Sequence, residues 1–461
     1  MTTDRAILSK DVVLSDGVLL SELIDQARHE VSMRVLSDPE IYRLEMQRLF
    51  SRTWIMVGHE TEIPKPGDFV TRHIGEDGVI VVRTKDGGIE ILLNACSHRG
   101  MQLCRTEVGT AAQFKCPYHG WVFSREGQFL GAPFEKEMYV DGLDRPSLGL
   151  RRARVETLGG VIFGNFDPEA PPLREFFGDF TWYLECILCR TDDGLEVLGA
   201  PQRAMVNSNW KGPGEQGSVD GYHTLGLHRS MFEIGMFGSL ENSETAGMIS
   251  VDVSANGGGL RCIDLSVLFQ TKQGTGATTT EERLAQMPPF GLTPDMVPQL
   301  YNNLSEGQVE VISSYPPAVG QAFCTFEFLL IPAALPDGSV GPFLTLHTWV
   351  PRGPEWFEMY TWVLVEKGAP PELKELGRMA ALQNLGSSGQ IEQDDGEAWP
   401  SQTKAAKGYI AQQGTYKYPA QRGHTPPDGW PGPGEVRYGF TSDDGQWQWW
   451  QRYFRFLLGE E

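Results

Sequence analysis

Two short segments of the chain each carry one cysteine and one histidine. The first is a C-x-H motif at Cys96 and His98, and the second is a C-x-x-H motif at Cys116 and His119. Two thiolates and two imidazoles can hold one tetrahedral zinc ion, or they can divide between the two irons of a [2Fe-2S] cluster. Zinc motifs usually pair like ligands within a loop, whereas each loop here supplies one ligand of each kind. The spacing therefore favours the iron–sulfur cluster over zinc.

A second group of metal-binding residue types comprises Asp220, His223 and His228. On a regular helix Asp220 and His223 share a face about 60° apart, but His223 and His228 lie about 140° apart. A break near Gly226 would allow both imidazoles to face one ion. Two imidazoles and one carboxylate are the ligands of non-haem Fe(II) oxygenases, which keep positions open for O2. By itself, this spacing is also typical of histidines that bind no metal.

The two patterns together resemble the catalytic α subunit of Rieske non-haem iron ring-hydroxylating oxygenases, of the naphthalene and biphenyl dioxygenase type. The Asp-x-x-His-x4-His pattern follows Asn209-Trp210-Lys211 and lies about 100 residues after the C-x-x-H motif, as in that family. The resemblance also includes segments 49–54, 66–68, 133–136 and 392–397.

The resemblance implies two metal cofactors. Cys96, His98, Cys116 and His119 would bind a [2Fe-2S] Rieske cluster. His223 and His228 would bind a mononuclear Fe(II), together with a third ligand from a distant helix. Alignment on Glu392-Gln393 favours Asp395 as this ligand over its neighbour Asp394.

The resemblance also implies an activity and partners. The chain would use O2, and electrons from NADH passed through a reductase and a ferredoxin, to cis-dihydroxylate an aromatic substrate. It would assemble with a β subunit as an α3β3 hexamer. Asp220 would connect His119 of one subunit to His223 of the next, so that electrons cross between chains. The alternative is that Asp220 only orients His223 within one chain.

Four positions are expected to line the substrate pocket. In the family, bulky aromatic residues occupy the positions that match Gly217, Leu385 and Ile391, whereas Gln216 follows the biphenyl-type pattern. Because the residues here are smaller, we expect a bulky or polycyclic substrate. The sequence does not distinguish a polycyclic hydrocarbon from a biaryl, a diterpenoid or an aromatic acid, and it leaves monohydroxylation open.

The competing hypothesis is a Rieske-type electron carrier, or a structural metal-binding protein, without catalysis. Such a protein needs only the β-rich residues 53–170. Residues 171–461, which carry the second ligand set, would then have no explanation, so the oxygenase is favoured.

The elements that must position these residues divide the chain into three parts. Residues 1–52 are predicted to be helical, with one helix over 18–36 and a second after the capping sequence 37–40. Residues 53–170 contain short β-type runs between turns, which predicts an all-β module. Residues 171–461 mix both types, with a hairpin over 343–365 and a helix over 371–385. The predicted fold is α+β: an all-β Rieske domain inserted in a catalytic domain with a central antiparallel sheet, of the helix-grip type that the resemblance implies.

Composition excludes several classes of partner. The 461 residues include 39 basic and 60 acidic ones, a net charge of −21, which disfavours nucleic acid and anionic lipid. No apolar run is long enough to span a bilayer, and the N-terminal residues resemble no secretory signal, so we expect a cytoplasmic protein. The odd number of cysteines, seven, argues against a disulfide framework. The cysteines outside the two motifs are expected to be buried thiols: Cys104, Cys186, Cys189, Cys262 and Cys324.

Overall fold

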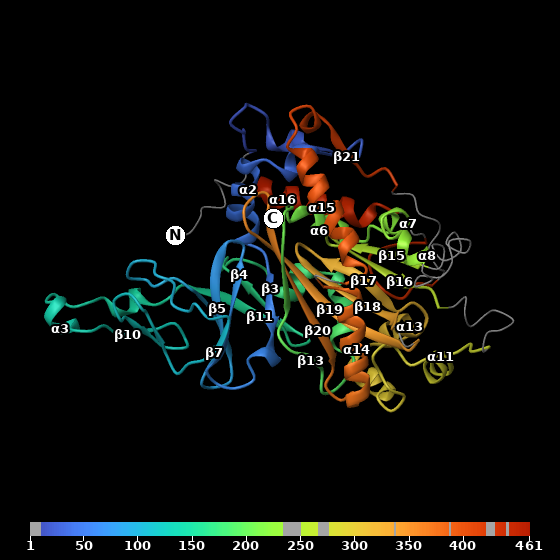
Figure 1. Ribbon diagram of the computed structural model, residues 1–461, viewed down its shortest axis with the longest axis horizontal. Helices are drawn as coiled ribbons and strands as arrows, with labels where there is room; N and C mark the ends of the chain where they lie inside the picture. The colour runs from blue at the N-terminus through green and yellow to red at the C-terminus, as the bar shows by residue number, and fades with distance from the viewer. Residues whose placement is uncertain are drawn as a thin grey trace. The chain divides into compact units, whose positions relative to one another are not determined.

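The computed structural model describes residues 11–233, 250–265, 276–335, 338–386, 389–420, 429–438 and 442–461. The chain forms two compact units, one of residues Phe50–Phe176 and one of residues Met1–Leu49 and Phe177–Glu461 (Figure 1). The first unit is thus inserted in the sequence of the second. The β module predicted over 53–170 falls within the inserted unit.

The inserted unit is built from antiparallel sheets. Its larger sheet has the strand order β3 (Ile55–His59), β12 (Val161–Asn165), β11 (Arg152–Leu158), β6 (Ile89–Leu93), β5 (Asp77–Arg83), β4 (Asp68–Ile74) and β7 (Val108–Thr110). Its smaller sheet has the order β10 (Phe129–Gly131), β9 (Val122–Phe123) and β8 (Phe114–Lys115), and the short helix α3 (Glu135–Met138) follows β10. Cys96 and Cys116 lie in a buried apolar cluster with Leu92, Trp121 and Phe123.

The second unit contains one large antiparallel sheet, which confirms the predicted α+β class. Its strand order is β13 (Leu195–Val197), β20 (Phe357–Glu366), β19 (Val340–Pro351), β18 (Phe326–Ala334), β17 (Pro317–Ala322), β16 (Gly258–Ile263), β15 (Ser250–Ala255) and β22 (Glu435–Tyr438), and β14 (Gln202–Val206) also pairs with β20. The predicted hairpin is the β19–β20 pair.

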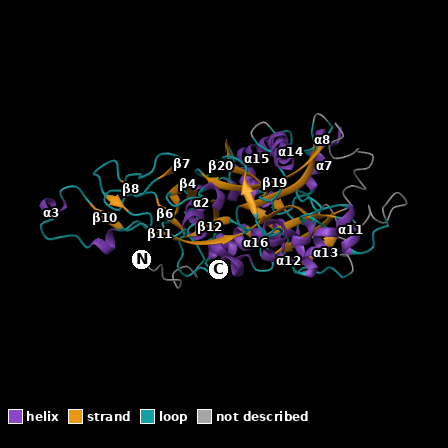
Figure 2. Cartoon of the chain, turned by 90° about the horizontal axis from the view of Figure 1, so that it is seen from below, coloured by secondary structure: helices purple, strands orange, loops and turns teal. Residues whose placement is uncertain are grey.

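Helices cover both faces of this sheet. In Figure 2, α14 (Pro371–Asn384) and α15 (Glu392–Ala406) lie on one side of the strands, and α12 (Leu300–Asn303), α13 (Glu306–Ser314) and α16 (Asp444–Leu458) lie on the other. The other α-helices in the described part of the chain are α2 (Pro39–Glu45), α4 (Leu173–Phe177), α5 (Phe180–Leu188), α6 (Lys211–Gln216), α7 (Tyr222–Gly226), α8 (Arg229–Glu233) and α11 (Thr280–Gln286). Among the described residues, no helix combines the length and apolar character that a membrane span requires.

The helix predicted over 18–36 is wrong. The segment instead forms two 3-10 turns, Leu20–Leu23 and Met33–Leu36, and the short strands β1 (Ile24–Asp25) and β2 (Glu30–Ser32). β2 pairs with β21 (Thr415–Lys417), which is far away in the sequence, so a tertiary contact overrides the local pattern. The second predicted helix is present, because α2 begins at Pro39 and the carboxylate of Asp38 accepts hydrogen bonds from its first N–H groups.

The last residue of α2, Glu45, anchors the segment that leads to the second ligand set. Its carboxylate is fully buried and lies 2.5 Å from Lys211 Nζ. Trp210 Nε1 donates to Glu45 Oε2 at 2.8 Å, and the hydroxyl of Tyr453 donates to Glu45 Oε1 at 2.5 Å. These contacts hold Trp210 and Lys211 in place at the start of α6. The Asn209-Trp210-Lys211 motif thereby positions the helix that leads to Asp220 and His223.

Replacing Glu45 with alanine is expected to lower the free energy of unfolding by about 3–5 kcal/mol, because Lys211 would keep a buried charge without a partner. Urea denaturation would measure this loss, and Glu45→Met combined with Lys211→Met should recover most of it. The control is Glu355→Ala, which breaks the exposed Lys407–Glu355 pair and should cost at most about 1 kcal/mol. Equal losses in the Glu45 and Glu355 variants would contradict the anchoring role.

Most cysteines outside the two motifs are buried, as predicted. Cys104, Cys186, Cys262 and Cys324 are buried, and Cys189 is half-buried. Burial raises the pKa of the Cys104 thiol to about 11, so this cysteine is an uncharged packing residue.

Candidate metal centres

The two loops predicted to hold the cluster follow the same backbone course. The N–H of Gly100 donates to the carbonyl of Cys96 at 2.8 Å, and the N–H of Gly120 donates to the carbonyl of Cys116 at 3.0 Å. Each cysteine N–H in turn donates to the carbonyl five residues later, at 2.9 and 2.7 Å. Both glycines have positive φ angles, 71° and 73°, which side chains disfavour. The loops therefore present their cysteines and histidines in matching geometry.

Like ligands from the two loops lie together. The thiols of Cys96 and Cys116 are within hydrogen-bond reach of each other, and burial raises the pKa of Cys96. The rings of His98 and His119 meet edge to face, with centroids 4.7 Å apart. His98 also stacks on Trp121, and its Nδ1 is buried with no hydrogen-bond partner among the residues that the structure describes. Two sulfurs on one side and two imidazoles on the other fit the two irons of a [2Fe-2S] cluster better than one tetrahedral ion.

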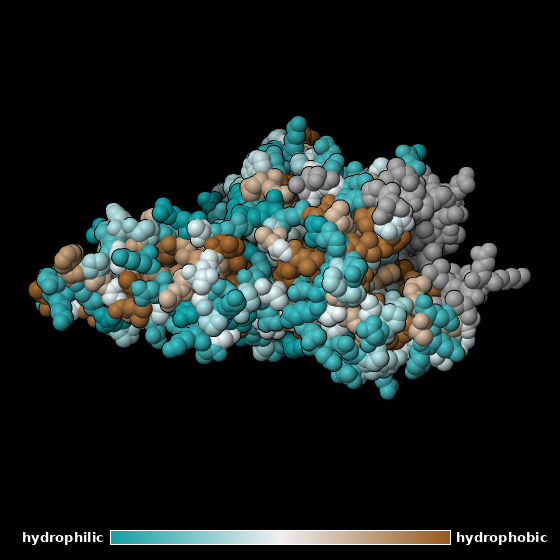
Figure 3. Space-filling model, turned by 60° about the horizontal axis from the view of Figure 1, so that its bottom comes forward, coloured by the Kyte–Doolittle hydropathy of each residue, from teal (hydrophilic) through white to brown (hydrophobic). Residues whose placement is uncertain are grey.

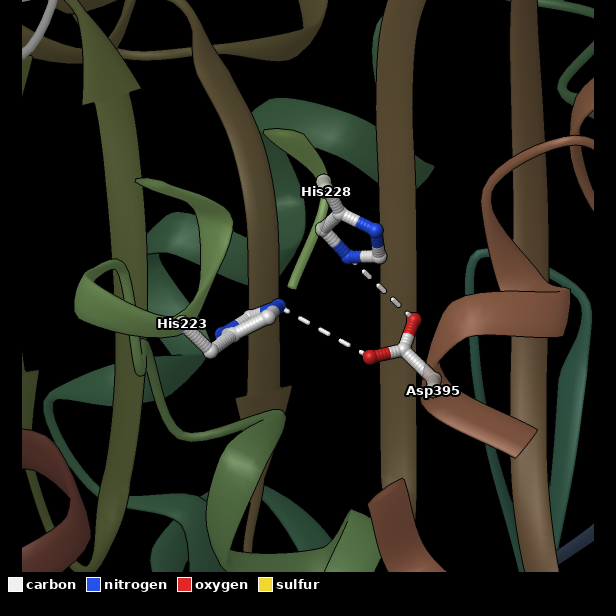
Figure 4. A group of neighbouring side chains, drawn as sticks. All are labelled: His223, His228 and Asp395. Carbon is white, nitrogen blue, oxygen red and sulfur yellow. Dashed lines mark ion pairs between the residues drawn. The ribbon is translucent and has the colours of Figure 1, made fainter. Parts of the chain in front are cut away.

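The helix break expected near Gly226 is present between α7 and α8. The break brings the rings of His223 and His228 to a centroid distance of 5.0 Å. His223 Nε2 lies 3.8 Å from one carboxylate oxygen of Asp395, and His228 Nε2 lies 3.5 Å from the other (Figure 4). One ligand atom from each of the three residues lies within 4.8 Å of the other two. This donor set suits a non-haem iron with open positions.

The outer ring nitrogens of both histidines face further carboxylates. His223 Nδ1 lies 3.5 Å from Asp220 Oδ2, and His228 Nδ1 lies 3.2 Å from Asp394 Oδ2. Metal-binding histidines commonly use their second nitrogen in this way, because the carboxylate fixes the ring orientation. The two neighbouring aspartates therefore occupy different places. Asp395 faces the Nε2 atoms of His223 and His228, whereas Asp394 faces the Nδ1 atom of His228 on the other side of that ring.

Asp220 is held by a tightly packed turn. Val219, just before it, has a φ of 74°, which is rare for a β-branched residue. A Cβ atom on Gly259 or Gly445 would lie 2.6 or 2.1 Å from the carbonyl oxygen of Ser218, so these glycines allow the turn to fit. Burial by itself would raise the pKa of Asp220, but the hydrogen bonds to His223, together with the positive charges of His223 and Arg261, hold the pKa below its usual value.

A cavity of about 310 Å³ opens beside His223, His228 and Asp395. The four predicted pocket residues, Gln216, Gly217, Leu385 and Ile391, all line it. Gln216 also supports the metal site, because its Nε2 donates to Asp395 Oδ1 at 2.7 Å while its Oε1 accepts from Trp399 Nε1 at 2.7 Å. The pocket residue thereby fixes the orientation of the Asp395 carboxylate.

The idea that Gly217 leaves open space for substrate needs correction. A Cβ atom on Gly217 would lie 2.5 Å from Gln321 Oε1 and 3.0 Å from Glu327 Oε1. The glycine is therefore required by the close approach of two polar side chains, and a phenylalanine there would displace them. Leu385 and Ile391 line the same cavity.

Sequence reasoning missed several polar residues of the cavity wall. The lining also includes Arg261, Glu327, His347 and Glu392. A signal for Glu327 was present, because this acid stands in the otherwise apolar run 326–331. A charged residue in a buried strand usually has a specific function or partner.

Comparisons with known proteins agree with this geometry. Residues 53–147 match the family described as the Rieske [2Fe-2S] domain. The α subunit of biphenyl 2,3-dioxygenase from Rhodococcus jostii (strain RHA1) is 32% identical over 92% of this chain and 88% of that relative. The α subunit of N,N-dimethyl phenylurea N-demethylase from Sphingobium sp. (strain YBL2) is 33% identical over 85% of this chain and 84% of that relative.

Solved structures show the same similarity. Naphthalene 1,2-dioxygenase from Rhodococcus sp., bound to indole, superimposes with a TM-score of 0.85 at 34% identity and covers 96% of this chain and 97% of that one. The chain belongs to the catalytic α subunits of the Rieske non-haem iron ring-hydroxylating dioxygenases. It is therefore an oxidoreductase with a [2Fe-2S] cluster and a mononuclear iron, and the hypothesis of a bare electron carrier is wrong.

Proposed function

We propose that Cys96 and Cys116 bind one iron of the cluster, and that His98 and His119 bind the other. His223, His228 and Asp395 bind the mononuclear Fe(II). The observation that carries the second assignment is the approach of two Nε2 atoms to one carboxylate in the wall of the cavity.

The reaction that this site supports best is cis-dihydroxylation of an aromatic ring. When bound, the cluster supplies single electrons and the Fe(II) supplies open coordination positions for O2. The cavity holds the ring beside the triad, and Gln216 keeps Asp395 in place. The electrons come from NADH through a reductase and a ferredoxin.

A second candidate reaction is monohydroxylation, because one of the relatives is an N-demethylase. Turnover of an aromatic panel under ¹⁸O2, scored by product mass, separates the two. Dihydroxylation adds two labelled oxygen atoms to each product, whereas monohydroxylation adds one.

The active form is proposed to be an α3β3 hexamer in which Asp220 connects two subunits. Asp220 Oδ1 accepts from the N–H of His223, and 29% of the side chain is exposed, which leaves the carboxylate open to a hydrogen bond from His119 of the partner subunit. Exposed apolar side chains in and around α3 support contacts between subunits: Phe134, Met138 and Val140. Figure 3 shows hydrophobic patches between hydrophilic residues on the face in view.

We expect ferredoxin-dependent turnover to depend on salt. The segment from position 96 to position 125 contains one acidic residue, Glu107, and four basic residues: Arg99, Arg105, Lys115 and Arg125. Because opposite charges speed association, kcat/KM for an acidic ferredoxin should fall about ten-fold or more from low to high ionic strength. Arg99→Glu should weaken this dependence, because it lowers the local net charge from +3 to +1, whereas Lys85→Glu, in the turn at the other end of β6, should preserve it. Turnover that does not respond to salt would remove the idea.

Replacing Leu385 with phenylalanine is expected to narrow the cavity. Overpacking of this kind costs about 1–3 kcal/mol, so kcat/KM for biphenyl should fall about ten-fold while that for benzene changes little. Competition between the two substrates would measure the ratio. The control is Leu382→Phe, at an exposed position in the last turn of helix α14, which Leu385 follows directly. Equal loss with both substrates would show that Leu385 does not set the size limit.

A further inference from the structure

A row of polar side chains crosses the large sheet. In register, Gln321 on β17 is opposite Glu327 on β18, Glu327 is opposite His347 on β19, and His347 is opposite Thr361 on β20. Residues directly opposite each other in antiparallel strands project from the same face of a sheet. Glu327 and His347 of this row line the cavity beside the proposed iron site.

The neighbours of Glu327 have already used their hydrogen-bond donors. Gln321 Nε2 donates to the carbonyls of Gly214 and Cys324, and Gln321 Oε1 accepts from Trp349 Nε1. The two ring nitrogens of His347 face two threonine hydroxyls, at 3.0 and 3.2 Å. Burial lowers the pKa of His347 to about 3, so this ring is neutral and does not balance a carboxylate.

Glu327 itself has no hydrogen-bond or ion-pair partner within the part of the chain that the structure describes. Burial, followed by the nearby charges of Asp395 and Glu392, raises its pKa well above the usual value. A carboxyl group in such surroundings is costly until it receives a hydrogen bond. Its Oε1 lies next to Gly217, so it faces the cavity close to Gln216, which holds Asp395.

The acidic and basic side chains around the cavity also indicate which kind of ligand it can bind. Among the described residues that line the cavity, four carry carboxyl groups, namely Asp220, Glu327, Glu392 and Asp395, and one, Arg261, carries a guanidinium. Arg261 already pairs with Asp252 through two contacts of 2.9 and 3.1 Å. A group that donates N–H bonds would complete this wall, whereas an anionic substrate would find no unpaired lysine or arginine side chain among the described residues that line it.

We propose that Glu327 selects aromatic substrates that carry an amine or another N–H donor, and that it accepts a hydrogen bond from this group while the ring lies beside the iron. This inference rests on the proposed function, because it places the substrate in the same cavity. It makes Glu327 a specificity residue, and the rest of the cavity wall provides apolar contact through side chains such as Leu329, Ile331 and Leu385.

Three probes of the same ring and nearly the same size test the proposal: 1-naphthylmethylamine, 1-ethylnaphthalene and 1-naphthylacetate. Calorimetric titration of the purified holoenzyme should show the amine binding about ten-fold or more tightly than the ethyl compound, because a hydrogen bond to a charged group is worth about one to two powers of ten in affinity. The acetate should bind most weakly.

Variants of Glu327 and Glu392 distinguish a specific effect of Glu327 on amine binding from a general effect of the acidic groups in the cavity. Glu327→Gln should bring the amine and ethyl compounds within about three-fold of each other, and Glu327→Leu should reverse their order. Glu392→Gln is the matched control, because the Glu392 carboxylate already accepts from the N–H of Gly386; it should keep most of the amine preference. Unchanged circular dichroism and thermal unfolding of each variant would show that the unit that carries Glu327 and Glu392 is folded.

Two outcomes would overturn the inference. Wild-type protein that binds the ethyl compound as tightly as the amine, or an amine preference that survives in Glu327→Leu, would show that Glu327 does not select the substrate. Tightest binding of the acetate would show that the carboxyl group instead donates to an anion. If binding follows Glu327 as expected but no probe is hydroxylated when electrons are supplied, the proposed function fails and the binding assignment stands.

Discussion

Replacing Asp395 with alanine is expected to abolish oxygenation while the protein keeps the red-brown colour of its cluster. The two imidazoles that remain cannot hold the iron, because the carboxylate opposite both Nε2 atoms is lost. Loss of an outer carboxylate behind a metal-binding histidine typically costs about 10–100-fold in metal affinity or activity, and loss of the ligand itself should exceed this. Product formation and the visible spectrum of one sample measure both effects.

The neighbouring aspartate is the matched control for this variant. Asp394→Ala removes the group 3.2 Å from His228 Nδ1 but keeps the three converging ligands, so it should reduce activity about 10–100-fold without abolishing it. Cys116→Ala should have the opposite signature and bleach the cluster. An active Asp395→Ala together with an inactive Asp394→Ala would reverse the assignment of the two aspartates.

Replacing Asp220 with asparagine is expected to leave both metals bound and to slow electron transfer between them strongly. Asparagine keeps the size of the side chain but removes the negative charge beside His223 Nδ1 and one of the two oxygens that would accept hydrogen bonds from His223 and, as proposed, from His119 of the partner subunit. In single turnover, reoxidation of the reduced cluster with substrate and O2 present should slow by about 10–100-fold, the scale for loss of such a partner. Stopped-flow absorbance of the cluster measures this rate.

The metal content and the oligomeric state of the Asp220→Asn variant serve as controls for this experiment. Both should match the wild type, because Asp220 does not belong to the three converging ligands. Reoxidation of the cluster at the normal rate in Asp220→Asn would exclude the route between subunits, and Asp220 would then only orient His223.

Sequence predicted those parts of the site that depend on local spacing. The C-x-H and C-x-x-H loops, and the helix break between His223 and His228, follow from residues a few positions apart. The different positions of Asp394 and Asp395 depend on how α15 lies against His228, which no local pattern contains. Local patterns also failed for residues 18–36, which were predicted to be helical. Strand β2 in this segment pairs with β21, which is distant in the sequence.

Glu327 illustrates a further limit of reasoning from sequence. Its charge within an apolar strand was visible, but its function depends on the cross-strand register with Gln321 and His347. Gly217 shows the reverse case. Its small size suggested open space, whereas the structure shows two polar side chains at close range.

The central claim is that this chain holds a two-iron cluster and a separate single iron on the residues named. Iron analysis of anaerobically purified protein tests it most directly. We expect close to three irons per chain in the wild type, close to two in His228→Ala with the cluster spectrum intact, and loss of the cluster irons in Cys116→Ala. Two irons per chain in both the wild type and His228→Ala, or a colourless protein that contains zinc, would contradict the account.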